Sequence, residues 1–179
     1  MQNTHGELPQ KSHIYVAADG SADYTSVQAA VDAVPVHNSR DVIIHIQPGV
    51  YEERIEVSGD KPFITMIGEG EKPEDTVLTF GIWAGMTWDN GDVTTTFRTA
   101  TVNVYANYFK AENLTMANSY DGSAGGGRQA LALYASGFHI EFVKCRFYGA
   151  QDTVYTKDGS QLFTECYIEG DVDFIFGGA

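Results

Sequence analysis

Residues 145–177 read CRFYGAQDTVYTKDGSQLFTECYIEGDVDFIFG and contain one pattern twice. Apolar, small and acidic residues all recur at one separation of 21 positions: Cys145 with Cys166, Phe147 with Ile168, Gly149 with Gly170, and Asp152 with Asp173. A repeat of this length is typical of a solenoid, because each coil repeats the face of the coil before it. Equivalent residues of stacked coils lie roughly 5 Å apart, so the two aspartates are predicted to be neighbours.

The repeat extends towards the N-terminus with one longer interval. Asn113-Leu-Thr and Cys145-Arg-Phe each follow an aromatic run, and the interval between them is 32 positions. We assign the positions in excess of 21 to the Gly-rich segment 118–128, which is predicted to be a loop that leaves the coil. The sequon at Asn113 is interpreted as an asparagine that bonds to backbone, in preference to a glycosylation site.

The remaining pattern favours an all-β parallel β-helix. Short β-branched runs are separated by turn residues and lack a helical period; they cover 42–46, 55–57, 63–67, 94–99, 100–105 and 108–116. His13–Ala18 is predicted to be a first strand. The irregular segment 83–92 is predicted to be a loop.

One amphipathic helix precedes these runs. Ser26 is a predicted N-cap, Pro35 ends the helix, and the apolar positions between them have helical spacing: Val27, Ala30, Val31 and Val34. We expect this short helix to cover the open edge of the first coil. Residues 1–12 are predicted to be a flexible lead, and 13–179 one β-helix domain.

Composition narrows the classes of function. The 179 residues are 43% hydrophobic and carry a formal net charge of -13, which disfavours nucleic acid or an anionic membrane as partner. No apolar run reaches the ~18 residues of a membrane span. Met1–Gln10 lacks the pattern of a signal peptide. The five histidines have no metal-ligand spacing, so no metal or other cofactor is expected.

Asp152 and Asp173 are the candidate catalytic pair. Two carboxylates at this distance cannot both ionise freely, so one pKa rises while the other stays low, which supplies a proton donor and a nucleophile or base. Gln151, and Gln129 22 positions before it, are predicted to place amide donors beside the pair, as a developing oxyanion requires. Asp171, which could compete for the nucleophile's role, lies outside the 21-residue register.

Apolar residues around Asp173 are predicted to desolvate it: Val172, Phe174, Ile175 and Phe176.

Two alternatives stay open, one for the acids and amides and one for the cysteines. The acids and amides could instead form a side-chain ladder that only satisfies backbone groups. Cys145 and Cys166, as neighbours, either form a disulfide in an oxidising compartment or are two buried thiols.

Several motifs resemble those of pectin methylesterases, the pectinesterase family, from about residue 14 to the last residue. They are VAADGS at 16–21, VQAAVDAVP at 27–35, GVYEE at 49–53, TFRTATV at 96–102, QALAL at 129–133, GAQDTVY at 149–155 and GDVDFIFG at 170–177. The resemblance implies a right-handed parallel β-helix that hydrolyses methyl esters of galacturonate in pectin, without a metal.

By position, the resemblance makes Asp173 the nucleophile, Asp152 the acid and then the base, and Gln151 the group that stabilises the oxyanion. Gln129 would help to bind substrate and hold the same anion. Four residues match positions that contact the sugar: Thr96, Tyr155, Val172 and Phe176. The resemblance also implies an extracellular protein, although a cytoplasmic one is compatible with this chain, and we expect a monomer.

One departure concerns a Leu-Gly-Arg-Pro-Trp segment that family members carry after the nucleophile motif, whose Arg holds the nucleophilic carboxylate. This chain contains no such segment, so we expect it to have little esterase activity. Alternatives are a glycoside hydrolase of polygalacturonase type, since paired carboxylates also cleave glycosidic bonds, and an inactive β-helical carbohydrate-binding module. Action on thioesters is a further variant.

Overall fold

The computed structural model describes residues 12–122 and 128–179 of the chain. The predicted lead, except Ser12, and positions 123–127 of the predicted loop lie outside these residues. The helical elements are α1 (Val27–Ala33), η1 (Pro73–Asp75) and η2 (Thr96–Arg98). The strands are β1 (His13–Val16), β2 (Val42–Ile46), β3 (Gly49–Glu52), β4 (Ile55–Val57), β5 (Ile64–Gly68), β6 (Thr76–Phe80), β7 (Val102–Val104), β8 (Lys110–Glu112), β9 (Thr115–Asn118), β10 (Leu133–Val143), β11 (Arg146–Tyr148), β12 (Val154–Thr164), β13 (Tyr167–Glu169) and β14 (Ile175–Gly177).

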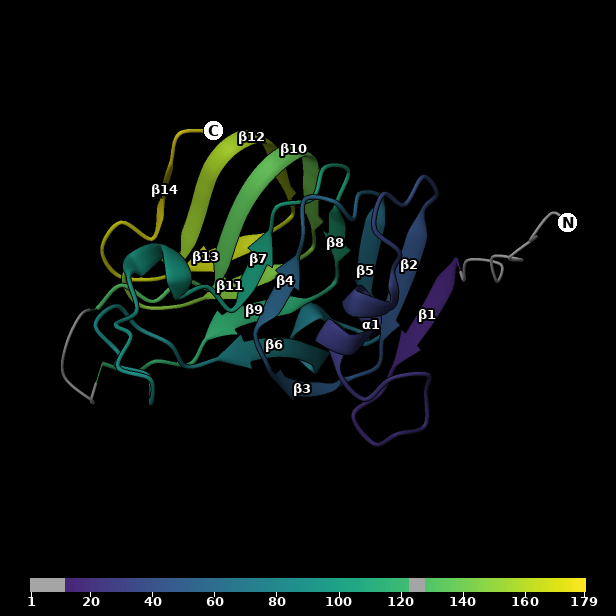
Figure 1. Cartoon of the computed structure of the whole chain (residues 1–179), viewed down its shortest axis with the longest axis horizontal. Coiled ribbons are helices and arrows are strands. Elements are labelled where there is room, and N and C mark those ends of the chain that lie inside the picture. Colours follow the sequence, from purple (N-terminus) through teal and green to yellow (C-terminus); the bar gives the residue numbers. More distant parts are fainter. Residues whose placement is uncertain (1–11, 123–127) are drawn as a thin grey trace, which may run out of the picture.

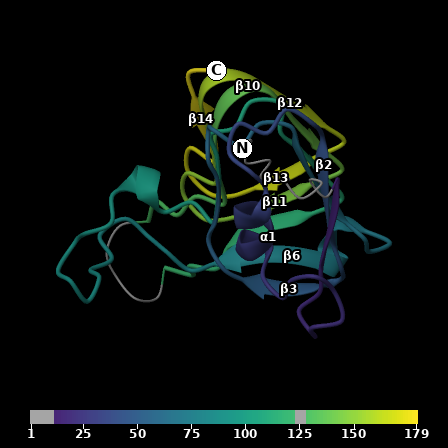
Figure 2. The ribbon, with the colours of Figure 1, turned by 45° about the vertical axis from the view of Figure 1, so that its right-hand side comes forward.

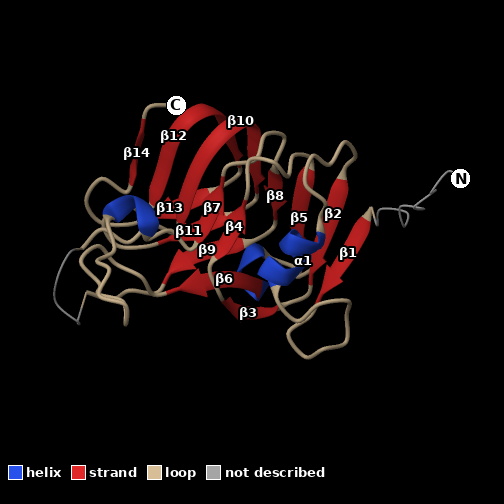
Figure 3. Ribbon diagram, viewed as in Figure 1, coloured by secondary structure: helices blue, strands red, loops and turns tan. Residues whose placement is uncertain are grey.

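The strands stack as the coils of a parallel β-helix (Figures 1 and 3). We call face 1 the stack of β4, β7, the first part of β10, the first part of β12, and β14. Face 2 contains β1, β2, β5, β8 and the second parts of β10 and β12, and face 3 contains β3, β6, β9, β11 and β13. Every pair of these strands is parallel, so the predicted fold class is confirmed.

The pairing register confirms the 21-residue repeat. Leu133 pairs with Val154, Val154 with Ile175, and Phe147 with Ile168. The match of Asn113 with Cys145 is wrong by one position, because Arg146 pairs with Thr115 and so places Leu114 at the level of Cys145.

The turn at the corner between faces 2 and 3 explains this error. Asn113, Lys144 and Glu165 occupy the same place in successive coils and have left-handed φ values of 55°, 52° and 54°. Asn113 also donates its side-chain amide to the carbonyls of Gly68 and Gly70 at 2.9 and 2.8 Å, as the backbone-bonding interpretation predicted. The turn residue therefore sets the register. Its left-handed conformation cannot be recognised from the pattern of apolar residues on which the sequence match relied.

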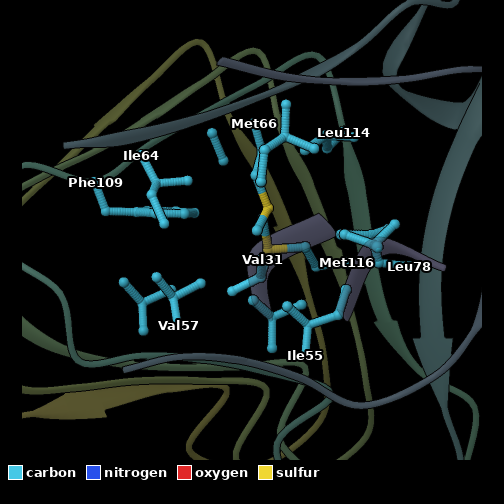
Figure 4. Close-up of a cluster of buried hydrophobic side chains, with 14 of the residues drawn as sticks. Val31, Ile55, Val57, Ile64, Met66, Leu78, Phe109, Leu114 and Met116 are labelled. Carbon is cyan, nitrogen blue, oxygen red and sulfur yellow. The ribbon is translucent and has the colours of Figure 1, made fainter. Parts of the chain in front are cut away.

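The helix is confirmed, with Ser26 as N-cap accepting a hydrogen bond from the amide of Ala29. The Glu53 carboxylate accepts from the amides of Val27 and Gln28 at 2.8 and 2.9 Å, satisfying two more free donors of the first turn. Figure 2 shows α1 across the mouth of the first coils, where it packs on β1, β2 and β4. Val31 points from α1 into the core (Figure 4).

The core fills the space enclosed by the three faces. Its fully buried side chains alternate along the strands with outward-facing residues, as in Ile55 and Val57 on face 1 and Ile64 and Met66 on face 2 (Figure 4). Phe142 packs edge-on against Phe147, with ring centroids 5.4 Å apart. The interior is thus filled mainly by apolar side chains, and the candidate functional residues lie on the outer surface and in the turns.

Two strand predictions are wrong. Residues 94–99 do not form a strand, because Thr96–Arg98 is the 3-10 helix η2 in a segment that leaves the coil. Residues 108–116 form two strands, β8 and β9, because the left-handed turn at Asn113 bends the chain between them.

Candidate active site

Asp152 and Asp173 lie at the same turn of successive coils, between faces 3 and 1. Each precedes its face-1 strand by two residues and has a left-handed φ, 67° for Asp152 and 51° for Asp173. Aspartate tolerates this region better than most residues. The amide of Asp152 donates to the carbonyl of Val172 at 3.1 Å, and the amide of Val154 to that of Phe174 at 2.9 Å. The two acids are therefore held side by side.

The environments of the two carboxyl groups differ. Asp152 is buried, with 7% of its surface exposed, whereas Asp173 is exposed. Burial and, second, the negative charge of Asp173 raise the pKa of Asp152, and a hydrogen bond with Gln151 lowers it. Asp152 consequently keeps its proton to higher pH than an ordinary aspartate, as a proton donor requires.

The predicted desolvation of Asp173 is wrong. Val172 and Ile175 are 60% and 53% exposed, and Phe174 is exposed as well. Within the described residues β14 pairs on one side only, with β12, so these apolar side chains have no coil over them.

Gln129 and Gln151 occupy adjacent coils beside the acids. They form a parallel bridge, with the amide of Ala130 donating to the carbonyl of Gln151 at 2.9 Å, and both are half-buried. The spacing of 22 positions thus marked neighbouring residues, as predicted. The side chain of Gln151 is hydrogen-bonded to Asp152, and Gln129 lies one coil away from Gln151.

An aromatic row follows the acids along the outside of face 1. Tyr134, Tyr155 and Phe176 are register partners, with Tyr155 stacked on Phe176 at a centroid distance of 4.5 Å. The ring centroids of Phe97, in η2, and Tyr155 lie 4.9 Å apart. This contact brings η2, which also carries Thr96, next to the aromatic row. Val172 lies in the turn of Asp173.

Two residues of this row escaped the sequence analysis. Tyr134 stands 21 positions before Tyr155, so the repeat could have identified it. Phe97 had no such signal, because η2 lies outside the coil repeat and only the tertiary fold brings it onto Tyr155.

Cys145 and Cys166 are both free thiols in this structure, one buried and one partly exposed. The hydrogen bond from Cys145 lowers the pKa of the Cys166 thiol to about 7. The same bond and burial raise the pKa of Cys145. The predicted adjacency holds, while oxidation to a disulfide stays a prediction.

Within residues 12–122 and 128–179, no three side chains of His, Cys, Asp or Glu are grouped as ligands of a metal ion. The helices of that same part of the chain are too short or too polar to cross a membrane.

The arrangement can perform acid and nucleophilic chemistry at one point. An exposed carboxylate is free to attack an electrophilic carbon, a buried carboxyl group beside it can protonate a leaving group, and nearby amides can receive negative charge. The aromatic row provides flat apolar faces of the kind that pack against sugar rings.

Comparison with known proteins is consistent with this chemistry. A sequence model described as Pectinesterase matches residues 13–179. Pectinesterase QRT1 of Arabidopsis thaliana is 41% identical over 167 residues, which cover 93% of this chain and 44% of that protein.

Solved structures give the same result. Pectin methylesterase from carrot has a TM-score of 0.80 and 34% identity, covering 96% of this chain and 50% of that chain. A pectin methylesterase in complex with a hexasaccharide has a TM-score of 0.82 and 29% identity, covering 92% of this chain and 51% of that one. The chain spans about half the length of the relatives that it matches.

Proposed function

This chain belongs to the pectinesterase family, and from this premise we propose that its site hydrolyses methyl esters of galacturonate units in pectin, releasing methanol. The observation that carries the proposal is the pairing of a buried Asp152, whose pKa is raised, with an exposed Asp173 in the next coil. Such a reaction would serve the breakdown or remodelling of plant cell walls.

In the first step, the Asp173 carboxylate attacks the ester carbonyl carbon and forms a tetrahedral oxyanion. The amides of Gln151 and Gln129 donate hydrogen bonds to this anion. Asp152 gives its proton to the departing methoxide, so methanol leaves and an acyl anhydride joins the galacturonate to Asp173.

In the second step, the ionised Asp152 takes a proton from water as that water attacks the acyl carbon. The anhydride breaks, the galacturonic acid is released and gives its remaining proton to solvent, Asp173 is regenerated as a carboxylate, and Asp152 is protonated again for the next cycle. One acid thus serves as donor and then as base, and its raised pKa favours the protonated form that the first step needs.

The substrate chain would lie along face 1. Tyr155 and Phe176 present stacked rings beside the acids, and Thr96 and Val172 flank them from η2 and from the turn of Asp173. We propose that these four residues contact the sugar units on either side of the ester.

Simultaneous measurement of methanol and of new reducing ends from methyl-esterified homogalacturonan tests the proposal. We expect a low methanol release, in line with the little activity expected from the sequence, without new reducing ends. Asp173→Asn, which keeps the shape and the left-handed φ of the residue, should lower that release about 10³-fold or more. Asp171→Asn is the matched control: it neutralises an exposed acid in the same turn and should leave methanol release unchanged.

Other outcomes separate the competing functions. New reducing ends would indicate glycosidic cleavage, and binding of the polymer with no methanol would indicate a carbohydrate-binding module. An extracellular location follows from the proposed substrate, since pectin lies outside the cell. A monomeric state is part of the proposal, and sedimentation checks it.

A further inference from the structure

Thr153 links the coil of Asp152 to the coil of Asp173. It follows Asp152 directly and is fully buried. Its hydroxyl lies 3.1 Å from the carbonyl oxygen of Ala150, in its own turn, and 3.1 Å from that of Glu169, in the next coil. A hydroxyl has a single proton, so one donor is shared between two acceptors that belong to different coils.

The two carbonyls are the ones that carry backbone hydrogen bonds between the turns. The amide of Asp171 donates to Ala150 at 2.9 Å, and the amide of Gly149 donates to Glu169 at 3.3 Å. The Thr153 hydroxyl therefore closes a small network in which each carbonyl accepts twice, once from backbone and once from Thr153. Both carbonyls therefore take part in hydrogen bonds that set the distance between the turn of Asp152 and the turn of Asp173.

Glycines make room for this hydroxyl. A Cβ atom on Gly149 would lie 3.0 Å from the Thr153 oxygen, and one on Gly170 would overlap it and lie 2.7 Å from the carbonyl of Ala150. The recurrence of glycine at 149 and 170 is thus explained by the close approach of Thr153.

We propose that Thr153 is a positioning residue for the esterase reaction: its hydroxyl, bridging Ala150 and Glu169, holds the carboxyl groups of Asp152 and Asp173 at their working separation. This inference rests on the proposed function for its catalytic meaning. The geometric part, the control of the separation, can be tested without turnover.

The chain contains a matched control. Thr101 precedes β7 as Thr153 precedes β12, is also fully buried, and donates to the carbonyls of Ala117 at 2.8 Å and Phe80 at 3.3 Å. No acid stands beside it, since Ala100 precedes it. Ala132 occupies the same coil position between the two threonines, so alanine is compatible with the backbone there.

The experiment compares Thr153→Ala, Thr153→Ser and Thr101→Ala. The titration of the Asp152 carboxyl is followed by ¹³C NMR in the folded protein, and kcat and KM are measured for methanol release. In Thr153→Ala we expect the pKa of Asp152 to fall, because the charge of Asp173 is held less closely. We expect kcat to drop about tenfold or more with little change in KM, as for a misplaced reacting group.

Thr153→Ser should behave as the parent, because it keeps the hydroxyl, and Thr101→Ala should lose stability without moving the titration of Asp152. The proposal is overturned if Thr153→Ala leaves both the titration and kcat unchanged, or if Thr101→Ala changes them equally. Should Thr153→Ala not fold, Thr153→Val supplies the same comparison with the volume retained. A parent that releases no methanol contradicts the proposed function, while the NMR titration still decides the positioning role.

Discussion

Two successive coils of this molecule carry the same pattern in different surroundings. The inner coil, 145–165, has paired strands on both sides, whereas the outer coil, 166–179, is paired on one side within the described residues. Phe147 and Cys145 of the inner coil are fully buried, while their counterparts Ile168 and Cys166 are only partly buried.

The same contrast separates the two acids. Asp152 and Asp173 share a residue type, a turn and a left-handed φ, yet one is buried and the other exposed. The repeat therefore decides where each acid lies, and the stacking of the described coils decides how far each is buried. Within the described residues, one motif thus places two acids in different surroundings.

The largest expected difference is between the two acids as catalysts. With a nitrophenyl ester of galacturonate, whose leaving group needs no proton, Asp152→Asn should release about one equivalent of nitrophenol in a burst and then stall, because the acyl intermediate forms but water is not activated. Asp173→Asn should show no burst, a difference of roughly 10³-fold in the first step. Stopped-flow absorbance measures both. A burst in Asp173→Asn would contradict the assignment of Asp173 as the nucleophile.

The next difference is in stability. Phe147→Ala in the inner coil should lower the free energy of unfolding by about 3–4 kcal/mol, because a fully buried ring leaves a cavity. Ile168→Ala, at the paired position of the outer coil, should cost only about 1–2 kcal/mol, since that side chain is partly exposed. Urea unfolding gives both values. Equal costs would mean that the outer coil is as well covered as the inner one.

The cysteines should show a smaller contrast, about tenfold in rate. Cys166 is partly exposed with a pKa lowered to about 7 by its bond with Cys145, so it should react with iodoacetamide before the buried Cys145. Peptide mass spectrometry follows each site, and denatured protein, in which both thiols react alike, is the control. If neither reacts until a reductant is added, the pair is a disulfide.

The smallest expected effect is the pH dependence of stability. The folded-state pKa of Asp152 is raised above its ordinary value of 3.8, so the folded protein binds this proton more tightly than the unfolded chain does. As pH rises from about 4 through the folded-state pKa, ionisation of Asp152 destabilises the fold, and the loss persists at neutral pH.

Asp152→Asn lacks this titration and should therefore gain stability relative to the parent across that window. Urea unfolding of both proteins between about pH 3.5 and pH 7 measures the gain. A difference that shrinks as pH rises would contradict the assigned direction of the pKa shift. Asp171→Asn, an exposed acid, should show no such trend.

The sequence analysis was accurate where a feature repeats locally. The capped helix, the run at 42–46 and the spacing of Asp152 from Asp173 all follow from periodicity, which the chain carries in its own order of residues. It failed at Asn113 and at 94–99, because the first is placed by a left-handed turn and the second belongs to a segment outside the coil.

By itself, the sequence determined that the chain winds into coils of 21 residues near its end and that two acids and two amides meet at one turn, since a repeat brings equivalent residues together whatever surrounds them. Only the tertiary structure decided which acid is buried, and that Phe97 reaches the row of Tyr155. Burial depends on how many coils stack around a residue, and no single stretch of sequence contains that number.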